Sequence, residues 1–286
     1  MRHDATVNGE AEGKSDLAQT LLGVRSILFL PASNLRAIAK ARSTSADLAI
    51  LDLEDAVKAK DKAAAREIAV EAVASDWPMP VAIRVNGIGS EWHSLDLDAV
   101  AKSKAKFVVV PRAISPHLIR SVGQAVAKPV LAMIETAAGV LGAAEIAHET
   151  AALIAGTNDL RADLQLPLDA TREPISVSLQ LIVLAARAAG VAAFDGVFNG
   201  LDDPEGFLAE AQAGCRLGFN GKSLIHPGQI ELCHRAFAPN VAEIERAQAL
   251  VDAFRGGAER FGDEMIERMH VEAARRVLHR AGKAPF

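Results

Sequence analysis

The chain has 286 residues, half of them hydrophobic and 23% charged, which is typical of a globular protein with one large α/β domain or two ordinary ones. Its formal net charge of −5 argues against nucleic-acid or membrane-surface partners, because both need a basic field. The only cysteines, Cys215 and Cys233, form no CxxC or Cys/His cluster, so we expect a reducing, cytoplasmic setting.

From Arg25 onward one pattern recurs: a short apolar run, then polar residues, then an alanine-rich stretch. Short apolar runs predict buried strands, and the longer stretches predict helices. The predicted strands are Ser26–Leu30, Leu48–Leu53, Val81–Val85, Phe107–Val110, Val130–Ile134, Ala152–Ala155, Ala192–Phe194 and Leu217–Phe219. The predicted helices include Ala37–Ser43, Lys58–Ala74, Pro116–Val126, Val140–His148, Ser176–Ala189 and Pro204–Ala213.

Strands that alternate with helices form parallel βαβ units, and eight units in about 200 residues favour a closed barrel over an open sheet. No G-x-G-x-x-G follows the first strand, which argues against a dinucleotide-binding sheet. We therefore predict an α/β fold, a (β/α)8 TIM barrel over residues 23–235. Residues 1–22, polar and without an apolar segment, are predicted to form a flexible tail. Residues 236–286, with helices at Val241–Arg255 and Asp263–Arg280, are predicted to form a C-terminal helical arm or lid.

In such a barrel the chemistry lies at the C-terminal ends of the strands. Charged residues follow seven of the predicted strands at that end, and we expect them to converge on one rim. They are Asp52, Glu54 and Asp55, then Arg84, Arg112, Glu135, Asp159 and Asp195, and finally Lys222 and His226 after the eighth strand.

Glu135 and Asp159 are the predicted metal ligands. They lie 24 residues apart, about one βα unit, so adjacent strands would bring their carboxylates together. Two carboxylates without cysteine or a flanking histidine favour a hard cation, Mg²⁺ or Mn²⁺. A capping or salt-bridged loop acid is the alternative for Glu135 considered alone.

Arg84 follows the apolar run Val81–Ile83 and would present its guanidinium at the same rim, where it is suited to bind a substrate carboxylate. The alternative is a charge partner for Glu54 or Asp55, and both roles are compatible. We expect Glu54 and Asp55 to orient Arg84 and the metal-bound waters.

Several of these segments together resemble the citrate lyase β-subunit and malyl-CoA lyase group of the HpcH/HpaI aldolase superfamily. The matching segments are Arg25–Ala32, Asp52–Val57, Arg84–Asn86, Ile134–Thr136, Gly156–Leu160, Ala193–Val197 and Gly218–Pro227. They run in the family's order through most of the chain. The resemblance implies a Mg²⁺-dependent TIM-barrel lyase that acts on acyl-CoA substrates, usually as a homotrimer or homohexamer.

By motif position, Glu135 and Asp159 resemble the family's metal ligands and Arg84 its carboxylate-binding arginine. Arg36 and Lys40 resemble positions that approach the phosphates of CoA, although a solvated helix face is the alternative. Arg25 belongs to the family's opening motif, but at the start of its strand barrel geometry favours a structural role. 

Three residues depart from the family pattern. Arg112 stands where lysine is usual, and Asn199 where an acid is frequent. Glu267 stands where an aspartate of the arm reaches a neighbouring subunit's active site in some members. Since glutamate is one methylene longer, the acid would be displaced by ~1 Å.

The expected reaction is cleavage of a carbon–carbon bond in a CoA thioester of a hydroxycarboxylic acid, such as citryl-CoA or malyl-CoA. Arg84 would hold the carboxylate, and Glu267 or a metal-bound water would supply the final proton. Thioester hydrolysis is a further activity that the resemblance implies. Two alternatives stay open: a metal-dependent aldolase acting on hydroxy-keto acids without CoA, and an impaired barrel that serves as a binding or assembly subunit.

Overall fold

The computed structural model describes Leu17 and residues 20–283. Most of the predicted tail over residues 1–22 therefore lies outside the described residues. Within it, Leu21 is 1% exposed and packs among the barrel's core residues. The chain divides between Ala236 and Phe237 into two compact units, a barrel and a C-terminal arm.

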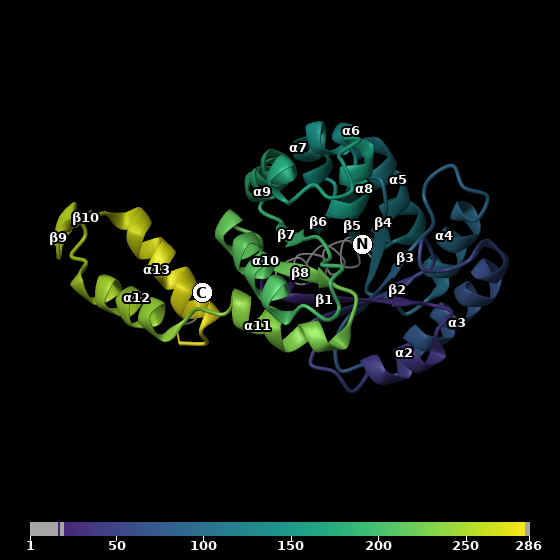
Figure 1. Cartoon of the computed structure of the whole chain (residues 1–286), viewed down its shortest axis with the longest axis horizontal. Helices are drawn as coiled ribbons and strands as arrows, with labels where there is room; N and C mark the ends of the chain where they lie inside the picture. Colours follow the sequence, from purple (N-terminus) through teal and green to yellow (C-terminus); the bar gives the residue numbers. More distant parts are fainter. Residues whose placement is uncertain (1–16, 18–19, 284–286) are drawn as a thin grey trace, which may run out of the picture. The chain divides into compact units, whose positions relative to one another are not determined.

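Eight parallel strands form a closed barrel in which each strand pairs with the next and β8 pairs with β1 (Figure 1). The strands are β1 (Ser26–Pro31), β2 (Leu48–Asp52), β3 (Val81–Arg84), β4 (Phe107–Val110), β5 (Val130–Ile134), β6 (Ala152–Ala155), β7 (Ala192–Asp195) and β8 (Gly221–Leu224). The predicted (β/α)8 barrel is confirmed.

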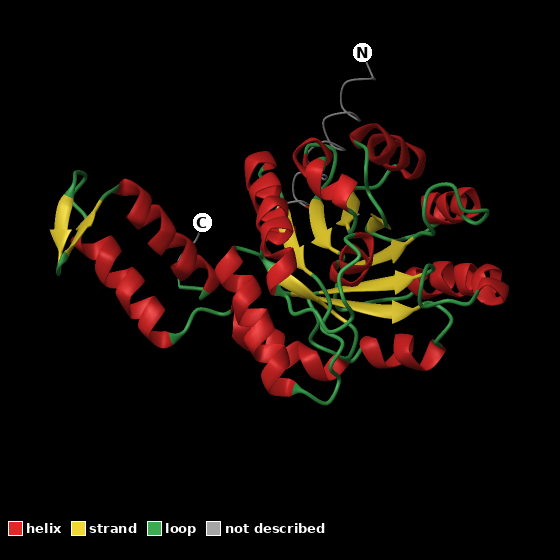
Figure 2. Cartoon of the chain, turned by 45° about the horizontal axis from the view of Figure 1, so that its top comes forward, coloured by secondary structure: helices red, strands yellow, loops and turns green. Residues whose placement is uncertain are grey.

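Helices surround this sheet, as Figure 2 shows by colour. In the described residues they are α2 (Leu35–Ala41), α3 (Lys62–Ala74), α4 (His93–Lys102), α5 (Pro116–Val126), α6 (Ala137–Leu141), α7 (Ala143–Ala147), α8 (Thr157–Asp163), α9 (Ser176–Ala189), α10 (Pro204–Leu217) and α11 (Ile230–Phe237). Three short 3₁₀ turns lie at Ala59–Asp61, Glu173–Ile175 and Pro227–Gln229. Within this part of the chain, every helix is too short or too polar to cross a lipid bilayer.

The predicted eighth strand at Leu217–Phe219 is wrong. Leu217 is the last residue of α10, and Gly218 ends that helix with a φ of 101°, a left-handed conformation that glycine adopts without strain. The strand begins instead at Gly221, where a Cβ would collide with the backbone of Arg25, the residue before β1. Lys222 and Ser223 made this strand look polar, although both are buried.

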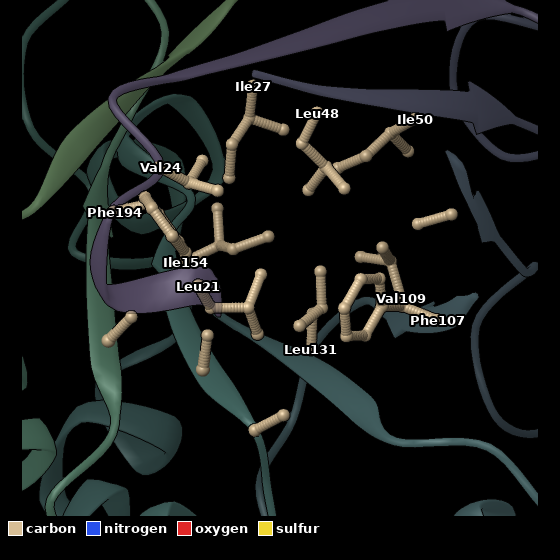
Figure 3. Close-up of a cluster of buried hydrophobic side chains, with 14 of the residues drawn as sticks. Leu21, Val24, Ile27, Leu48, Ile50, Phe107, Val109, Leu131, Ile154 and Phe194 are labelled. Atoms are coloured by element: carbon tan, nitrogen blue, oxygen red, sulfur yellow. The ribbon is translucent and has the colours of Figure 1, made fainter. Parts of the chain in front are cut away.

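Alternate residues of the strands point into the barrel and form its core. Figure 3 shows labelled side chains from β1, β2, β4, β5, β6 and β7 turned toward a common centre. The inward sets include Leu48 and Ile50 on β2, and Leu131 and Met133 on β5. The next inward position on β2 is Asp52, and on β5 it is Glu135. On β2 and on β5, the two-residue alternation therefore places an acid at the cavity end of a row of buried core residues.

The arm consists of α12 (Val241–Ala253), a hairpin of β9 (Glu259–Phe261) and β10 (Glu264–Ile266), and α13 (Arg268–Arg280). It has its own apolar cluster, formed by Ala247, Leu250, Ile266, Val271, Ala274 and Leu278. The predicted helix start at Asp263 is wrong, because Gly262 has a φ of 63° and begins a two-residue hairpin turn. Glu267 is consequently the N-cap residue of α13.

Candidate active site

Arg84, the last residue of β3, lies in a ring of carboxylates. Its Nε donates to Oδ1 of Asp52 at 2.6 Å and its Nη2 to Oδ2 at 2.7 Å, a bidentate pair between neighbouring strands. Its Nη1 is 2.9 Å from Oε2 of Glu54 and 3.7 Å from Oδ2 of Asp55. Burial alone would lower the pKa of Arg84, but the bonds and charge of Asp52 outweigh it and raise that pKa. The guanidinium is therefore permanently charged and oriented.

Glu54 lies on the loop after β2, and a buried lysine fixes this loop. Nζ of Lys62, on α3, donates to the carbonyl oxygens of Leu53 and Glu54 at 2.7 Å each and to Oδ1 of Asn86 at 2.5 Å. Burial raises the pKa of Glu54 to about 8, against the opposing charge of Arg84. At neutral pH the Glu54 carboxyl is consequently largely protonated, while Asp55 beside it is exposed.

Glu135 directly follows β5 and is 2% exposed. Its Oε1 accepts a hydrogen bond from the backbone N–H of Arg112 at 2.6 Å, whereas its buried Oε2 has no hydrogen-bond partner. Gly156 admits this carboxylate, because a Cβ there would overlap Oε2. Burial, and secondly the charge of Asp159, raises the pKa of Glu135 to about 7.

Asp159 lies in the first turn of α8, directly after β6, and its side chain is 42% exposed. Its Oδ1 is 4.0 Å from Nη1 of Arg112. Asp159 and Glu135 line one cavity, and the charge of Asp159 contributes to the raised pKa of Glu135. The structure thus brings the predicted pair together across neighbouring strands.

A cavity of about 410 Å³ opens over this cluster. Its walls are contributed by the C-terminal ends of β1, β2, β3, β5, β6, β7 and β8. The lining side chains include Phe29, Pro31, Asp52, Asp55, Arg84, Met133, Glu135, Asn158, Asp159, Asn199 and Ser223. This volume suits a small polar organic acid.

The carboxylate pair fits a hard cation. Glu135 Oε2 is a buried carboxyl oxygen without a donor, and Asp159 presents a second carboxylate to the same cavity. The described residues contain no group of three or more His, Cys, Asp or Glu side chains arranged to hold a metal ion. A cation here would take two protein carboxylates and complete its shell with water or substrate oxygens, which is the habit of Mg²⁺.

Four other predicted site residues are not among those that line this cavity. Arg25 precedes β1 at the opposite end of the strand and pairs with Asp47, so the structure gives it a role in joining strands. Arg36 and Lys40 are exposed on α2, which follows β1 at the cavity end, but neither lines the cavity. Glu267 is exposed in the arm, where its backbone N–H donates to Nδ1 of His270.

The expectation that Asp195 and Lys222 face the rim is wrong. Asp195 follows the inward-facing Phe194, so it points outward, as does Lys222 on β8. Both are 0% exposed and form an ion-pair network with Arg172 and Glu210 between the sheet and its helices. They stabilise the barrel wall. His226 likewise caps a turn, accepting from the N–H of Gly228.

Three features of the site were missed from the sequence. Ser223, 1% exposed, lines the cavity with a hydroxyl that has no hydrogen-bond partner. Asn158, in the first turn of α8, and Asn199, in the loop after β7, exchange side-chain amide hydrogen bonds. Lys62 is buried within a predicted helix. Of these three features, only Lys62 had a signal in the sequence. It is a lysine in the first turn of a helix, close enough along the chain to reach the loop after β2.

Comparison with known proteins identifies relatives over nearly the whole chain. The chain is 39% identical to a (3S)-malyl-CoA thioesterase of Cereibacter sphaeroides over 269 residues, which span 90% of this chain and 94% of the relative. It is 32% identical to the citrate lyase subunit beta of Escherichia coli over 280 residues, 90% of this chain and 93% of the relative.

A solved structure is also similar: protein CitE from Mycobacterium tuberculosis in complex with magnesium, acetoacetate and coenzyme A. The match has a TM-score of 0.83 and 32% sequence identity, and it covers 92% of this chain and all of the other. The family model described as HpcH/HpaI aldolase/citrate lyase matches residues 25–227. This chain therefore belongs to the HpcH/HpaI aldolase/citrate lyase family of enzymes.

Proposed function

We propose that this enzyme is a Mg²⁺-dependent lyase that cleaves a carbon–carbon bond in a CoA thioester of a hydroxycarboxylic acid of the malyl-CoA or citryl-CoA type. The observation that carries the proposal is the Glu135/Asp159 pair beside the oriented Arg84 in one cavity. The relatives named for malyl-CoA and citrate, and the neighbour solved with magnesium and coenzyme A, support the substrate class and the metal.

Glu135 and Asp159 would hold the cation, and Arg84 would bind the substrate carboxylate. Bound Mg²⁺ would lower the pKa of the substrate hydroxyl and help orient it. Asp52 occupies the Nε–Nη2 edge of Arg84, which leaves the Nη1 side toward Glu54 and the cavity for an incoming carboxylate. Because Glu54 is largely protonated at neutral pH, it competes only weakly for that guanidinium.

A proton must reach the enolate that leaves. We assign this step to Glu267 of a neighbouring copy, or to a water held by Glu135 and Asp159. Arg36 and Lys40 would attract the CoA phosphates, since both are exposed cations on the helix that follows a cavity-lining strand. Glu54 and Asp55 act through Arg84 as positioning residues.

We also propose a cytoplasmic homotrimer or homohexamer. Cys215 and Cys233 form no disulfide, which suits a reducing compartment. Val177, Leu181 and Leu184 form an exposed apolar row on α9, which suits burial between subunits. Light scattering of the purified chain measures the subunit number, and a monomer would refute this part of the proposal.

The function is tested with Glu135→Gln and Asp159→Asn, which keep side-chain size while removing each charge. Calorimetric Mg²⁺ titration is expected to show at least tenfold weaker binding for each variant, with a parallel loss of malyl-CoA and citryl-CoA cleavage. Glu149→Gln, which changes a partly buried acid that follows α7 and does not line the cavity, is the matched control and should bind as the wild type does. Unchanged Mg²⁺ affinity in both site variants would refute the metal assignment.

A product assay separates the reactions. Release of free CoA together with the intact hydroxy acid identifies thioester hydrolysis, and release of an acyl-CoA together with a keto acid or aldehyde acid identifies lyase cleavage. Turnover of hydroxy-keto acids that lack CoA would favour an aldolase instead.

A further inference from the structure

Arg112 has an unusual backbone. It follows β4 and the buried Pro111, and its φ of 49° lies in the left-handed region that side chains rarely adopt. Such a conformation persists only where surrounding contacts enforce it, and it is often found at functional sites. Here its consequence is visible, because it aims the Arg112 N–H at Oε1 of Glu135 at 2.6 Å. One oxygen of Glu135 is thereby held, and Oε2 is left without a donor.

The side chain of Arg112 reaches the second carboxylate. Its Nη1 is 4.0 Å from Oδ1 of Asp159, and the side chain is 55% exposed. It therefore places a positive charge beside two acids that line the same cavity. The guanidinium makes no closer ion pair among the described residues, and water can reach it. Its contact with Asp159 is loose enough to break.

We propose that Arg112 is a positioning residue with two functions: its N–H fixes Glu135, and its guanidinium is a resident counter-ion that a divalent cation displaces from Asp159. The inference deepens the proposed metal site and rests on it. A guanidinium and a cation near one carboxylate repel each other, so binding must drive the Arg112 side chain toward solvent. Arg112 thus stabilises the metal-free pair and weakens cation binding.

The test is calorimetric Mg²⁺ titration of the wild type, Arg112→Gln, Arg112→Gly and Arg112→Lys. The glutamine variant removes the charge. The glycine variant also removes the charge, and glycine adopts a φ of 49° without strain. The backbone N–H to Glu135 is present in every variant. We expect about three- to tenfold tighter Mg²⁺ binding in both, and little change in the lysine variant, which keeps the charge. The difference should shrink between about 0.05 M and about 0.5 M NaCl, because salt screens exposed charges.

Arg120→Gln is the matched control. Arg120, on α5, is 54% exposed and pairs with Glu149, which follows α7; its loss changes the net charge equally, and neither residue lines the cavity. We expect wild-type Mg²⁺ affinity for this variant. Thermal melting supplies a second readout, in which the melting temperature in EDTA is compared with that in excess Mg²⁺. Mg²⁺ should raise the melting temperature more in Arg112→Gln than in the wild type.

The two proposals fail in different ways. If the wild type does not bind Mg²⁺, or if Glu135→Gln binds it normally, the proposed metal site is wrong. If the wild type binds Mg²⁺ through Glu135 but both Arg112→Gln and Arg112→Gly bind it equally or more weakly, the counter-ion role is wrong.

Discussion

Glu54 and Arg84 show how one contact depends on protonation. Glu54 Oε2 is 2.9 Å from Nη1 of Arg84, yet burial outweighs this charge and raises the Glu54 pKa to about 8. Asp52, on the same guanidinium, makes two short hydrogen bonds and carries the counter-charge. The two acids have different tasks: Asp52 orients the arginine, and Glu54 stays largely neutral beside it at pH 7.

This difference predicts a pH dependence of folding. The folded Glu54 keeps its proton up to about pH 8, whereas the unfolded chain releases it near 4.5. Between these values the unfolded state binds fewer protons, so the contribution of Glu54 to the free energy of unfolding falls as pH rises. Glu54→Gln has no titrating group at this position, so its free energy of unfolding does not fall with pH for this reason. We expect its stability relative to the wild type to rise between pH 5 and pH 8, by at most about 1.4 kcal/mol per pH unit.

Urea unfolding of both proteins in EDTA measures this slope. Glu149→Gln is the control, because the hydrogen bond from Arg120 lowers the pKa of Glu149, and its stabilising effect is lost only as pH falls toward and below that value. The control's difference from the wild type should therefore be flat across the same range. A flat difference for Glu54→Gln as well would show that Glu54 is already ionised at low pH in the folded state.

At the scale of elements, helix ends differ in how well their residues suit the backbone. The helices α9 and α10 end on glycines in the left-handed region, Gly190 and Gly218, whereas α5 ends on Ala127 with a φ of 53°. Alanine is disfavoured there because its Cβ crowds the following carbonyl group. Ala127 is exposed, so burial of its methyl group offsets little of this cost.

We therefore expect Ala127→Gly to stabilise the protein by about 0.5–1 kcal/mol, measured as the shift of the urea midpoint at constant slope. Gly190→Ala is the reciprocal control, since no atom would contact the added Cβ and only the backbone conformation is tested. It should destabilise by a similar amount. Destabilisation by Ala127→Gly would mean that the flexibility gained by the unfolded chain outweighs the strain relieved.

The element scale also shows what the sequence can predict. Seven strands were located within one or two residues, because each is a continuous apolar run buried on both faces. The eighth was misplaced because it contains Lys222, whose charge is neutralised by Asp195 on β7 and Glu210 on α10, a pairing that forms only in the folded barrel. The hairpin before Glu267 was read as helix because its charged residues also suit an exposed helix.

The same reasoning applies to the candidate site. Asp52, Arg84, Glu135 and Asp159 line one cavity because the barrel's strand order brings the C-terminal ends of their strands to the same rim. Asp195 looked equivalent in the sequence, but the facing of a strand-end residue depends on register, and its phase relative to Phe194 turns it outward. Ser223 and the Asn158–Asn199 pair needed the three-dimensional structure, because uncharged polar residues are common in loops and give no distinctive signal.

At the scale of the whole molecule, the barrel contains the candidate metal pair and Arg84, while the proposed acid Glu267 belongs to the other compact unit. Among the described residues, the arm's apolar cluster contains six buried residues with five partly buried ones packed against them, which is a small core for an isolated domain. If Glu267 donates a proton in the active site of a neighbouring copy, the reaction requires the assembled oligomer. In such a homo-oligomer each active site needs the barrel of one copy and the arm of another, so activity requires two intact halves from two subunits.

Complementation between two inactive variants tests this arrangement. Glu135→Gln disables the barrel's cation site and keeps the arm, whereas Glu267→Gln keeps the barrel and disables the arm. We expect each variant alone to be nearly inactive, with Mg²⁺ affinity preserved in Glu267→Gln. In co-expressed mixtures, an intact barrel meets an intact arm in about one site in four if subunits mix randomly and arms act between copies, so about a quarter of wild-type turnover should return.

If the arm instead serves its own barrel, mixing restores nothing. Wild-type turnover by Glu267→Gln alone would exclude Glu267 as the proton donor and leave that step to water at the Glu135/Asp159 pair.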